Sequence, residues 1–176
     1  MTSSEGAGPE RAAPERIAGF FPARGSFAWY CVLAWHVALI PTILILLGAH
    51  ALFASAGVDV EALQKPAREI AQRSVWITLV VAPLVETVVL ALLVTGLARF
   101  VRNVNLVAAI SALVWGALHA MFYPMWFFGV VWSFFVFSRG YLAWRPVSYK
   151  HAFGAAAVPH ALVNSSALLL QFFSKS

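Results

Sequence analysis

The feature that most restricts the fold of this chain is a series of long apolar stretches that carry almost no charge. A helix that crosses a membrane needs ~20 predominantly apolar residues, whereas the strands of a membrane barrel alternate in polarity over ~10 residues. Of the 176 residues, 61% are hydrophobic and 11% are charged, which leaves too little polar surface to cover a fold in water. The sequence therefore predicts an all-α integral membrane protein that forms one helical bundle.

We predict about five transmembrane helices and one amphipathic helix at the membrane surface. The predicted spans are residues 27–53, 74–98, 105–121, 125–137 and 152–173. Residues 55–73 carry apolar side chains at helical spacing among charged ones, which indicates an interfacial helix. Residues 1–26 are rich in Ala, Gly, Pro and Glu, so we expect a disordered or surface-lying tail. Residues 27–176 then form a single helical membrane domain.

Two of the predicted spans differ in composition in a way that suggests where each lies. Residues 105–121 are rich in small side chains, which let helices approach closely, so we expect this span at the centre of the bundle. Residues 125–137 are crowded with aromatic side chains on all faces, so we expect a short peripheral helix in contact with lipid. Pro41 is expected to kink the first span, because proline removes one backbone hydrogen bond.

The net charge of +5 does not indicate nucleic-acid binding, because the basic residues are spread through the short connections between apolar stretches. This distribution is typical of the positive-inside rule. With the N-terminus in the cytoplasm, basic residues would predominate inside, so we expect that orientation, in a bacterial inner membrane. The inside set is Arg11, Arg16, Arg24, Arg99, Arg102, Arg139, Arg145 and Lys150, and the outside set is Lys65, Arg68, Arg73 and Lys175.

Glu86 is the only acidic residue after Glu69, and it lies in the middle of an apolar stretch. A carboxylate at bilayer depth costs at least ~3 kcal/mol, so an acid inside the membrane marks a functional site by default. A purely structural role, in which Glu86 is protonated or hydrogen-bonded between helices, is the alternative. In either case the side chain requires a partner from another helix.

Three polar residues on other predicted spans lie at about the same depth as Glu86. They are His119, His160 and Asn164. His160 and Asn164 are four residues apart, so they project from one face of a helix. Each histidine alone is more often a hydrogen-bonded core residue, but together with the lone carboxylate they predict one catalytic site that contains an acid, a base and an amide donor.

Three short segments that contain these residues also resemble the motifs of a known family. The segments are Ala82-Pro83-Leu84-Val85-Glu86, Trp115 to His119, and His160 to Asn164. In this order they resemble the three motifs of the CPBP family, which contains the CAAX prenyl proteases and bacteriocin-processing proteins and is also called the Abi family. The resemblance covers roughly residues 74–170 of the chain.

The resemblance implies an intramembrane endopeptidase that hydrolyses a membrane-proximal peptide bond. Glu86 matches the first glutamate of the family and would act with His119 to activate a water molecule. His160 and Asn164 match the pair thought to stabilise the oxyanion, a role in which donors fixed in a dry site gain strength. The expected partners are the lipid bilayer and a peptide or membrane protein as substrate.

Three positions depart from the family pattern, in which the first motif is Glu-Glu-x-x-x-Arg and the second is Phe-x-x-x-His. Thr87 stands in place of the second glutamate, Ala91 in place of the arginine and Trp115 in place of the phenylalanine. The alternative function is therefore a catalytically degenerate membrane protein that binds a partner protein or peptide, in immunity or assembly, through the same polar pocket.

No cofactor is expected for the glutamate mechanism. A metal-dependent version would use Glu86, His119 and His160 as zinc ligands with water in the fourth position, although the sequence contains no His-Glu-x-x-His helix. A small transporter or proton-coupled channel would also use a buried acid and histidines. Such a protein is expected to show discontinuous repeats, and none is evident in this sequence.

Overall fold

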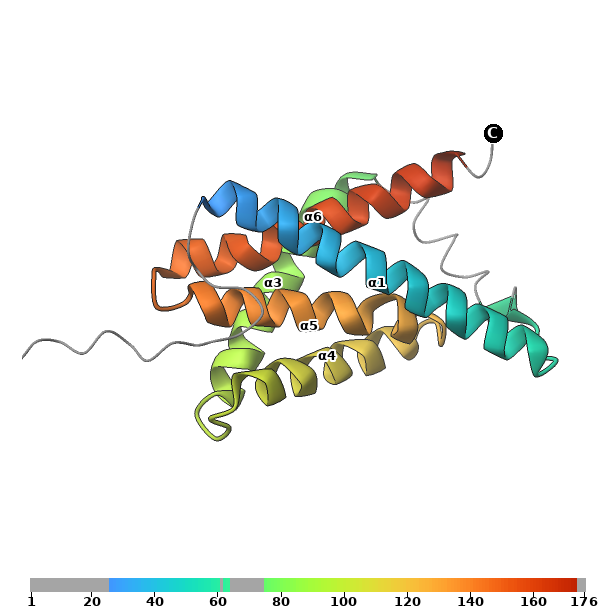
Figure 1. Ribbon diagram of the computed structural model, residues 1–176, viewed down its shortest axis with the longest axis horizontal. Helices are drawn as coiled ribbons and strands as arrows, with labels where there is room; N and C mark the ends of the chain where they lie inside the picture. Colours follow the sequence, from blue (N-terminus) through green and yellow to red (C-terminus); the bar gives the residue numbers. More distant parts are fainter. Residues whose placement is uncertain (1–25, 61, 64–74, 174–176) are drawn as a thin grey trace, which may run out of the picture.

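The computed structural model describes residues 26–60, 62–63 and 75–173, and within these residues every regular element is a helix (Figure 1). The elements are α1 (Phe27–Ser55), η1 (Ile77–Val81), α3 (Ala82–Leu97), α4 (Val104–Ala120), α5 (Trp126–Trp144) and α6 (Tyr149–Phe173). The π-helix η1 runs directly into α3. The predicted all-α bundle is confirmed.

Four of the described helices are long and apolar enough to cross a membrane. They are α1, the combined η1 and α3, α5 and α6, whereas α4 is apolar but shorter, with 17 residues. The chain is therefore a helical integral membrane protein with four to five spans. The predicted tail, apart from Ser26, and residues 61 and 64–73 of the predicted interfacial helix lie outside the described residues.

The expectation that the fourth span is short and peripheral is wrong. Helix α5 has 19 residues and contacts α1, α3, α4 and α6. Ten of its 19 residues are buried, compared with six of the 25 residues of α6. The reason is that small hydroxyl residues interrupt the aromatic run: Ser133 bonds Thr42 of α1 at 2.9 Å, and Ser138 bonds Ser111 of α4 at 3.0 Å.

Helix α4, which was expected at the centre, lies at one edge of the bundle in Figure 1. It packs mainly on α5, and its other face, which includes Leu113 and Leu118, is exposed. Its small residues still act as predicted, because Gly116 lets the ring of Phe127 approach to where a side chain would otherwise stand. The prediction of close packing held, and the prediction of a central position did not.

Helix α3 crosses behind the other helices at a steep inclination in Figure 1 and packs mainly against α6 and η1. Its buried face is formed by Pro83, Thr87, Leu90 and Val94, which recur at helical spacing. On the opposite side, the hydrophobic side chains of Leu84, Val85, Val88, Val89 and Leu92 are exposed. This arrangement brings the first half of α3 close to the middle of α6.

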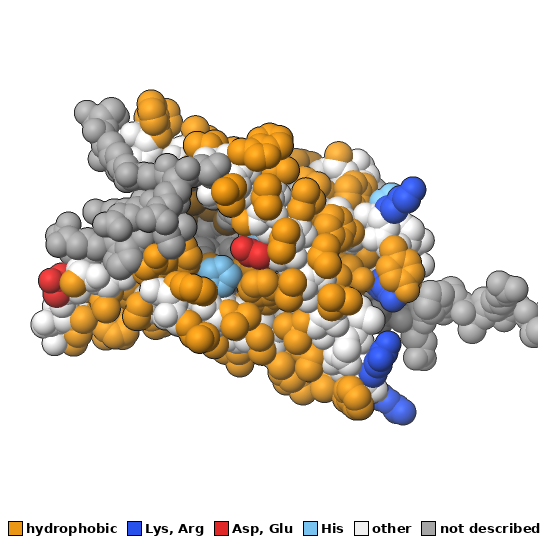
Figure 2. Space-filling model, turned by 180° about the vertical axis from the view of Figure 1, so that it is seen from behind, with side chains coloured by type: hydrophobic (Ala, Val, Ile, Leu, Met, Phe, Trp, Pro, Cys, Tyr) orange, Lys and Arg blue, Asp and Glu red, His pale blue; other side chains and the backbone are white. Residues whose placement is uncertain are grey.

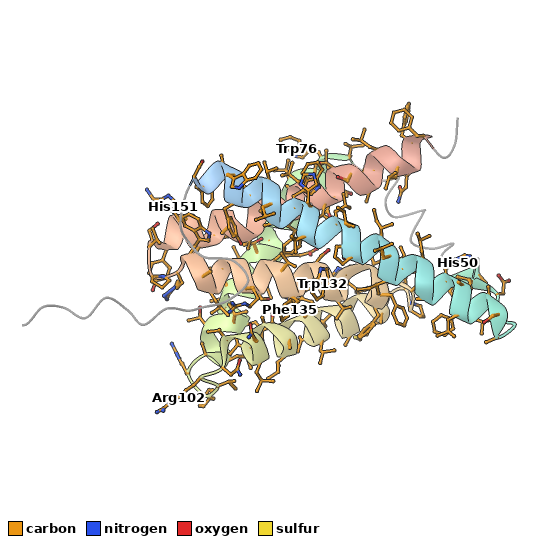
Figure 3. All side chains as sticks on the ribbon, in the orientation of Figure 1. His50, Trp76, Arg102, Trp132, Phe135 and His151 are labelled. Carbon is orange, nitrogen blue, oxygen red and sulfur yellow. The ribbon has the colours of Figure 1, made fainter. Side chains whose placement is uncertain are left out.

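Pro41 lies inside α1 and leaves the carbonyl of Val37 without its helical donor, because proline has no N–H. Trp132 of α5 donates its indole Nε1–H to that carbonyl at 2.7 Å. Figure 3 shows Trp132 in the middle of the bundle, where α5 and α1 meet. An orphaned backbone group inside a membrane protein is thus satisfied by a neighbouring helix.

We expect Trp132→Phe to destabilise the bundle by about 0.5–1.5 kcal/mol, because the Val37 carbonyl then has no donor. In a Pro41→Ala background the backbone N–H of residue 41 is restored, so the same substitution should have a smaller effect. Thermal unfolding of the wild type, both single variants and the double variant in detergent measures this coupling. Equal losses in both backgrounds would contradict the assignment.

Candidate functional site

Glu86 lies in the first half of α3, near the middle of the continuous span Ile77–Leu97, at the edge of the face that packs on the bundle. Its side chain is 25% exposed, so the carboxylate is partly open at the surface of the bundle. Figure 2 shows acidic and histidine side chains in the middle of a face that is otherwise mainly hydrophobic. A carboxylate at this position is costly unless another polar group faces it.

His160 of α6 is that group. Its Nε2 atom lies 3.6 Å from Oε2 of Glu86, and its side chain is 6% exposed. The separation is longer than a hydrogen bond, although such contacts often tighten only when substrate binds. The imidazole stacks on Phe137 at 4.9 Å and meets Phe134 edge-on at 5.3 Å, so its orientation is fixed by packing.

His119 lies near the end of α4, and its ring packs on Phe134, as does the ring of His160. Its Nδ1–H donates to the carbonyl of Trp115 at 2.8 Å, because a carbonyl can only accept. This bond fixes the neutral tautomer in which Nε2 carries a free lone pair. His119 makes no direct ion pair with Glu86 within the described residues, so a bridging water or substrate would have to connect them.

Asn164 lies one turn after His160, as predicted, but its amide has a partner in the chain. Its Nδ2 donates to the carbonyl of Thr78 at 2.9 Å. In the π-helix the N–H of Ala82 reaches the carbonyl of Ile77. The same register would give the Thr78 carbonyl a donor from residue 83, which is proline and has none. Asn164 therefore links α6 to η1 and retains one amide hydrogen for another acceptor.

Phe134 connects the two histidines, and sequence reasoning did not identify it. Its ring lies 5.5 Å from that of His119 and 5.3 Å from that of His160, and it stacks on Trp115 at 4.5 Å. Trp115 carries a buried Nε1–H with no hydrogen-bond partner within the described chain. Phe134 could not be singled out because many aromatic residues surround it in the sequence, and only the packing distinguishes it.

Thr87 and Ala91, which stand where the CPBP pattern has a second glutamate and an arginine, both lie on the inner side of α3. Thr87 is 1% exposed and Ala91 is half-buried against the core. An acid and an arginine at these positions would both be withdrawn from water. The small neutral side chains avoid that cost, and they leave Glu86 as the only charged group of α3 in the site.

The predicted zinc alternative used Glu86, His119 and His160 as ligands. Over residues 26–60, 62–63 and 75–173, no three or more His, Cys, Asp or Glu side chains are grouped so that they could hold a metal ion. These three residues are brought into one region but do not converge as a ligand set. The structure thus brings together Glu86 and His160 directly, places His119 on the same aromatic cluster, and joins Asn164 to η1.

Comparison of the chain with protein-family models, with curated proteins and with solved structures found no match.

Proposed function

We propose that the chain is a membrane-embedded endopeptidase of the CPBP type that hydrolyses a peptide bond without a covalent intermediate. The observation that carries the proposal is the approach of Glu86 to His160 at 3.6 Å between α3 and α6. A partly exposed carboxylate and an imidazole from two helices bring a general base next to a donor for the oxyanion. The ordered motif resemblance is the second support.

In this proposal Glu86 accepts a proton from a water molecule whose oxygen attacks the peptide carbonyl. His119 directs its free Nε2 lone pair at the same water, and the proton is later transferred to the leaving amine. His160 and the remaining amide hydrogen of Asn164 donate to the oxyanion, in an apolar surrounding that strengthens such bonds. The buried Nε1–H of Trp115 is a further donor on this aromatic cluster.

We propose a bacterial inner membrane location with the N-terminus in the cytoplasm. The support is that Arg99, Arg102, Arg145 and Lys150 lie on or next to the connections α3–α4 and α5–α6, whereas the predicted outside set falls outside the described residues. In Figure 2 the basic side chains gather at one end of the molecule. The positive-inside rule puts that end in the cytoplasm.

The test compares protein N-termini in membranes of cells that express the wild type, His119→Gln or His36→Gln. New N-termini next to apolar segments should arise with the wild type and disappear with His119→Gln. His36 is a matched control because its Nδ1–H makes the same bond, 2.8 Å to the carbonyl four residues earlier, on the exposed side of α1. Identical patterns from wild type and His119→Gln would refute the proposal.

A second candidate is a protein that binds a peptide or membrane protein without cleaving it. The observation that favours it is the bond from Asn164 to Thr78, which uses one donor that the oxyanion would need. The neutral residues Thr87 and Ala91 also favour a protein that binds without cleaving. This protein would generate no new N-termini, and crosslinking from the α3–α6 face to a partner would be lost in His160→Leu.

A further inference from the structure

Two polar contacts join α6 to the continuous helix formed by η1 and α3, and they lie one helical turn apart on α6. Nε2 of His160 lies 3.6 Å from Oε2 of Glu86. Nδ2 of Asn164 donates to the carbonyl of Thr78 at 2.9 Å. Four residues separate His160 from Asn164, which is about 6 Å along α6. Of these two contacts, the one made by Asn164 is short enough to be a hydrogen bond, so it is the firmer one.

The segment that Asn164 holds is directly connected to Glu86. The backbone of Trp76, Val81 and Ala82 is right-handed helical, so η1 continues into α3 without a break. The N–H of Ala82 donates to the carbonyl of Ile77, five residues earlier. Glu86 follows Ala82 by four residues, which is about one turn. A shift of η1 is therefore transmitted along one helix to the carboxylate of Glu86.

The π-helical register of η1 leaves a bond that the backbone cannot make. In this register the carbonyl of Thr78 pairs with the N–H of residue 83, which is proline and has none. In an α-helical register Thr78 would instead pair with Ala82, and the residues before Ala82 would be turned about the helix axis. The amide of Asn164 supplies the bond that the π-helical register lacks, so it favours that register over the α-helical one.

Hydrophobic burial contributes little to holding α3 against the bundle. The side chains of Leu84, Val85 and Val88 on its outer face are exposed. In a membrane, lipid tails solvate such a face as well as a neighbouring helix does, so close packing and interhelical hydrogen bonds determine where a helix lies. Pro83 and Thr87 supply the packing at this end of α3. The hydrogen bond to η1 is thus a major determinant of its position.

We propose that Asn164 is a positioning residue, which holds η1 in the π-helical register through the carbonyl of Thr78. In this register Glu86 faces His160. The role is additional to the contact of the second amide hydrogen with the oxyanion. Its effect on catalysis rests on the proposed function, whereas its effect on the placement of η1 and α3 does not.

The first test measures the distance between nitroxide labels on Val75→Cys and Leu169→Cys by electron paramagnetic resonance, in a Cys31→Ala background. Both labelled positions are exposed. Asn164→Ala should shift or broaden the distance distribution, because residue 75 turns about the helix axis when η1 changes register. Ser165→Ala is the matched control and should leave the distribution unchanged, since its hydroxyl bonds a carbonyl of its own helix at 2.7 Å. An unchanged distribution in Asn164→Ala would overturn the proposal.

The second test uses the proline that removes the backbone donor. Pro83→Ala supplies an N–H, so the carbonyl of Thr78 no longer depends on Asn164. The loss of kcat caused by Asn164→Ala should be roughly tenfold smaller in the Pro83→Ala background, because a small misplacement of a reacting group can cost about 10²-fold in rate. If Asn164 acted on the oxyanion alone, the loss would be equal in both backgrounds, and that result would overturn the proposal.

Failure of the proposed function and failure of the positioning role give different results. If the wild type cleaves no peptide, the proposed function fails, and the distance between the two labels decides the role of Asn164. Should Asn164→Ala not fold, adding Pro83→Ala should restore folding, because the backbone then supplies the missing donor. A double variant that also fails to fold would overturn the assignment.

Discussion

Glu86→Gln is expected to lower the rate of peptide-bond cleavage by about 10²–10⁴-fold, which is the usual contribution of a general base. Glutamine has nearly the same shape but cannot accept the proton of the attacking water. No other described carboxylate lies near His160, so nothing in this part of the chain can substitute. The rate is measured in liposomes on a substrate identified from its new N-terminus.

The matched control is Asp59→Asn, which replaces the other described acid. Asp59 accepts a hydrogen bond from the backbone of Ala62 at 3.0 Å through Oδ1, and asparagine keeps that acceptor. This variant should cleave at the wild-type rate. Glu86→Gln should also melt no lower than the wild type, because a neutral amide needs no counter-charge in an apolar site. Retention of more than a tenth of the wild-type rate would rule out catalysis by Glu86.

The bundle and the pairing of Glu86 with another helix could be predicted because each depends on a large energy. Continuous apolar stretches leave few choices besides membrane helices. A lone acid within such a stretch must find a polar partner, and His160 lies at a matching depth. Both conclusions follow from the inability of the lipid interior to solvate polar groups, and neither requires knowledge of side-chain packing.

The position of α5 could not be predicted because helices that are apolar all round carry little information about which face is inward. Aromatic side chains suit lipid and protein interior equally well. The inward face of α5 is determined by Ser133 and Ser138, whose hydroxyls form hydrogen bonds with α1 and α4. In the sequence these two serines stand among phenylalanine residues without a recognisable period.

The hydrogen bond from Asn164 to Thr78 could not be predicted, for a different reason. Its spacing from His160 correctly placed both residues on one face of α6, but its hydrogen bond to Thr78 depends on the π-helical register of η1. In that register the carbonyl that loses its helical donor to Pro83 belongs to Thr78, one residue earlier than in an α-helix. A proline in the sequence signals an orphaned carbonyl, but the sequence does not reveal the register or the donor.

Gly140→Ala is expected to destabilise the bundle by about 1–3 kcal/mol, the usual effect of forcing an extra carbon into a packed interior. A Cβ at Gly140 would collide with the hydroxyl of Tyr30 and would lie 2.8 Å from the carbonyl of Ala155. That carbonyl is held in place in α6 and lacks its helical donor because residue 159 is proline. Helices α1, α5 and α6 meet at this glycine, so relief would require one of them to move.

Gly129→Ala is the control on the same helix, because a Cβ there would meet nothing within 4 Å. It should be neutral or stabilise the helix by about 0.5–1 kcal/mol, since alanine loses less entropy than glycine. Tyr30→Phe removes one of the two atoms that clash at Gly140, so Gly140→Ala should cost less in that background. Thermal unfolding of the variants measures both effects. If the two glycine variants melt at the same temperature, the three helices do not meet at Gly140 as described.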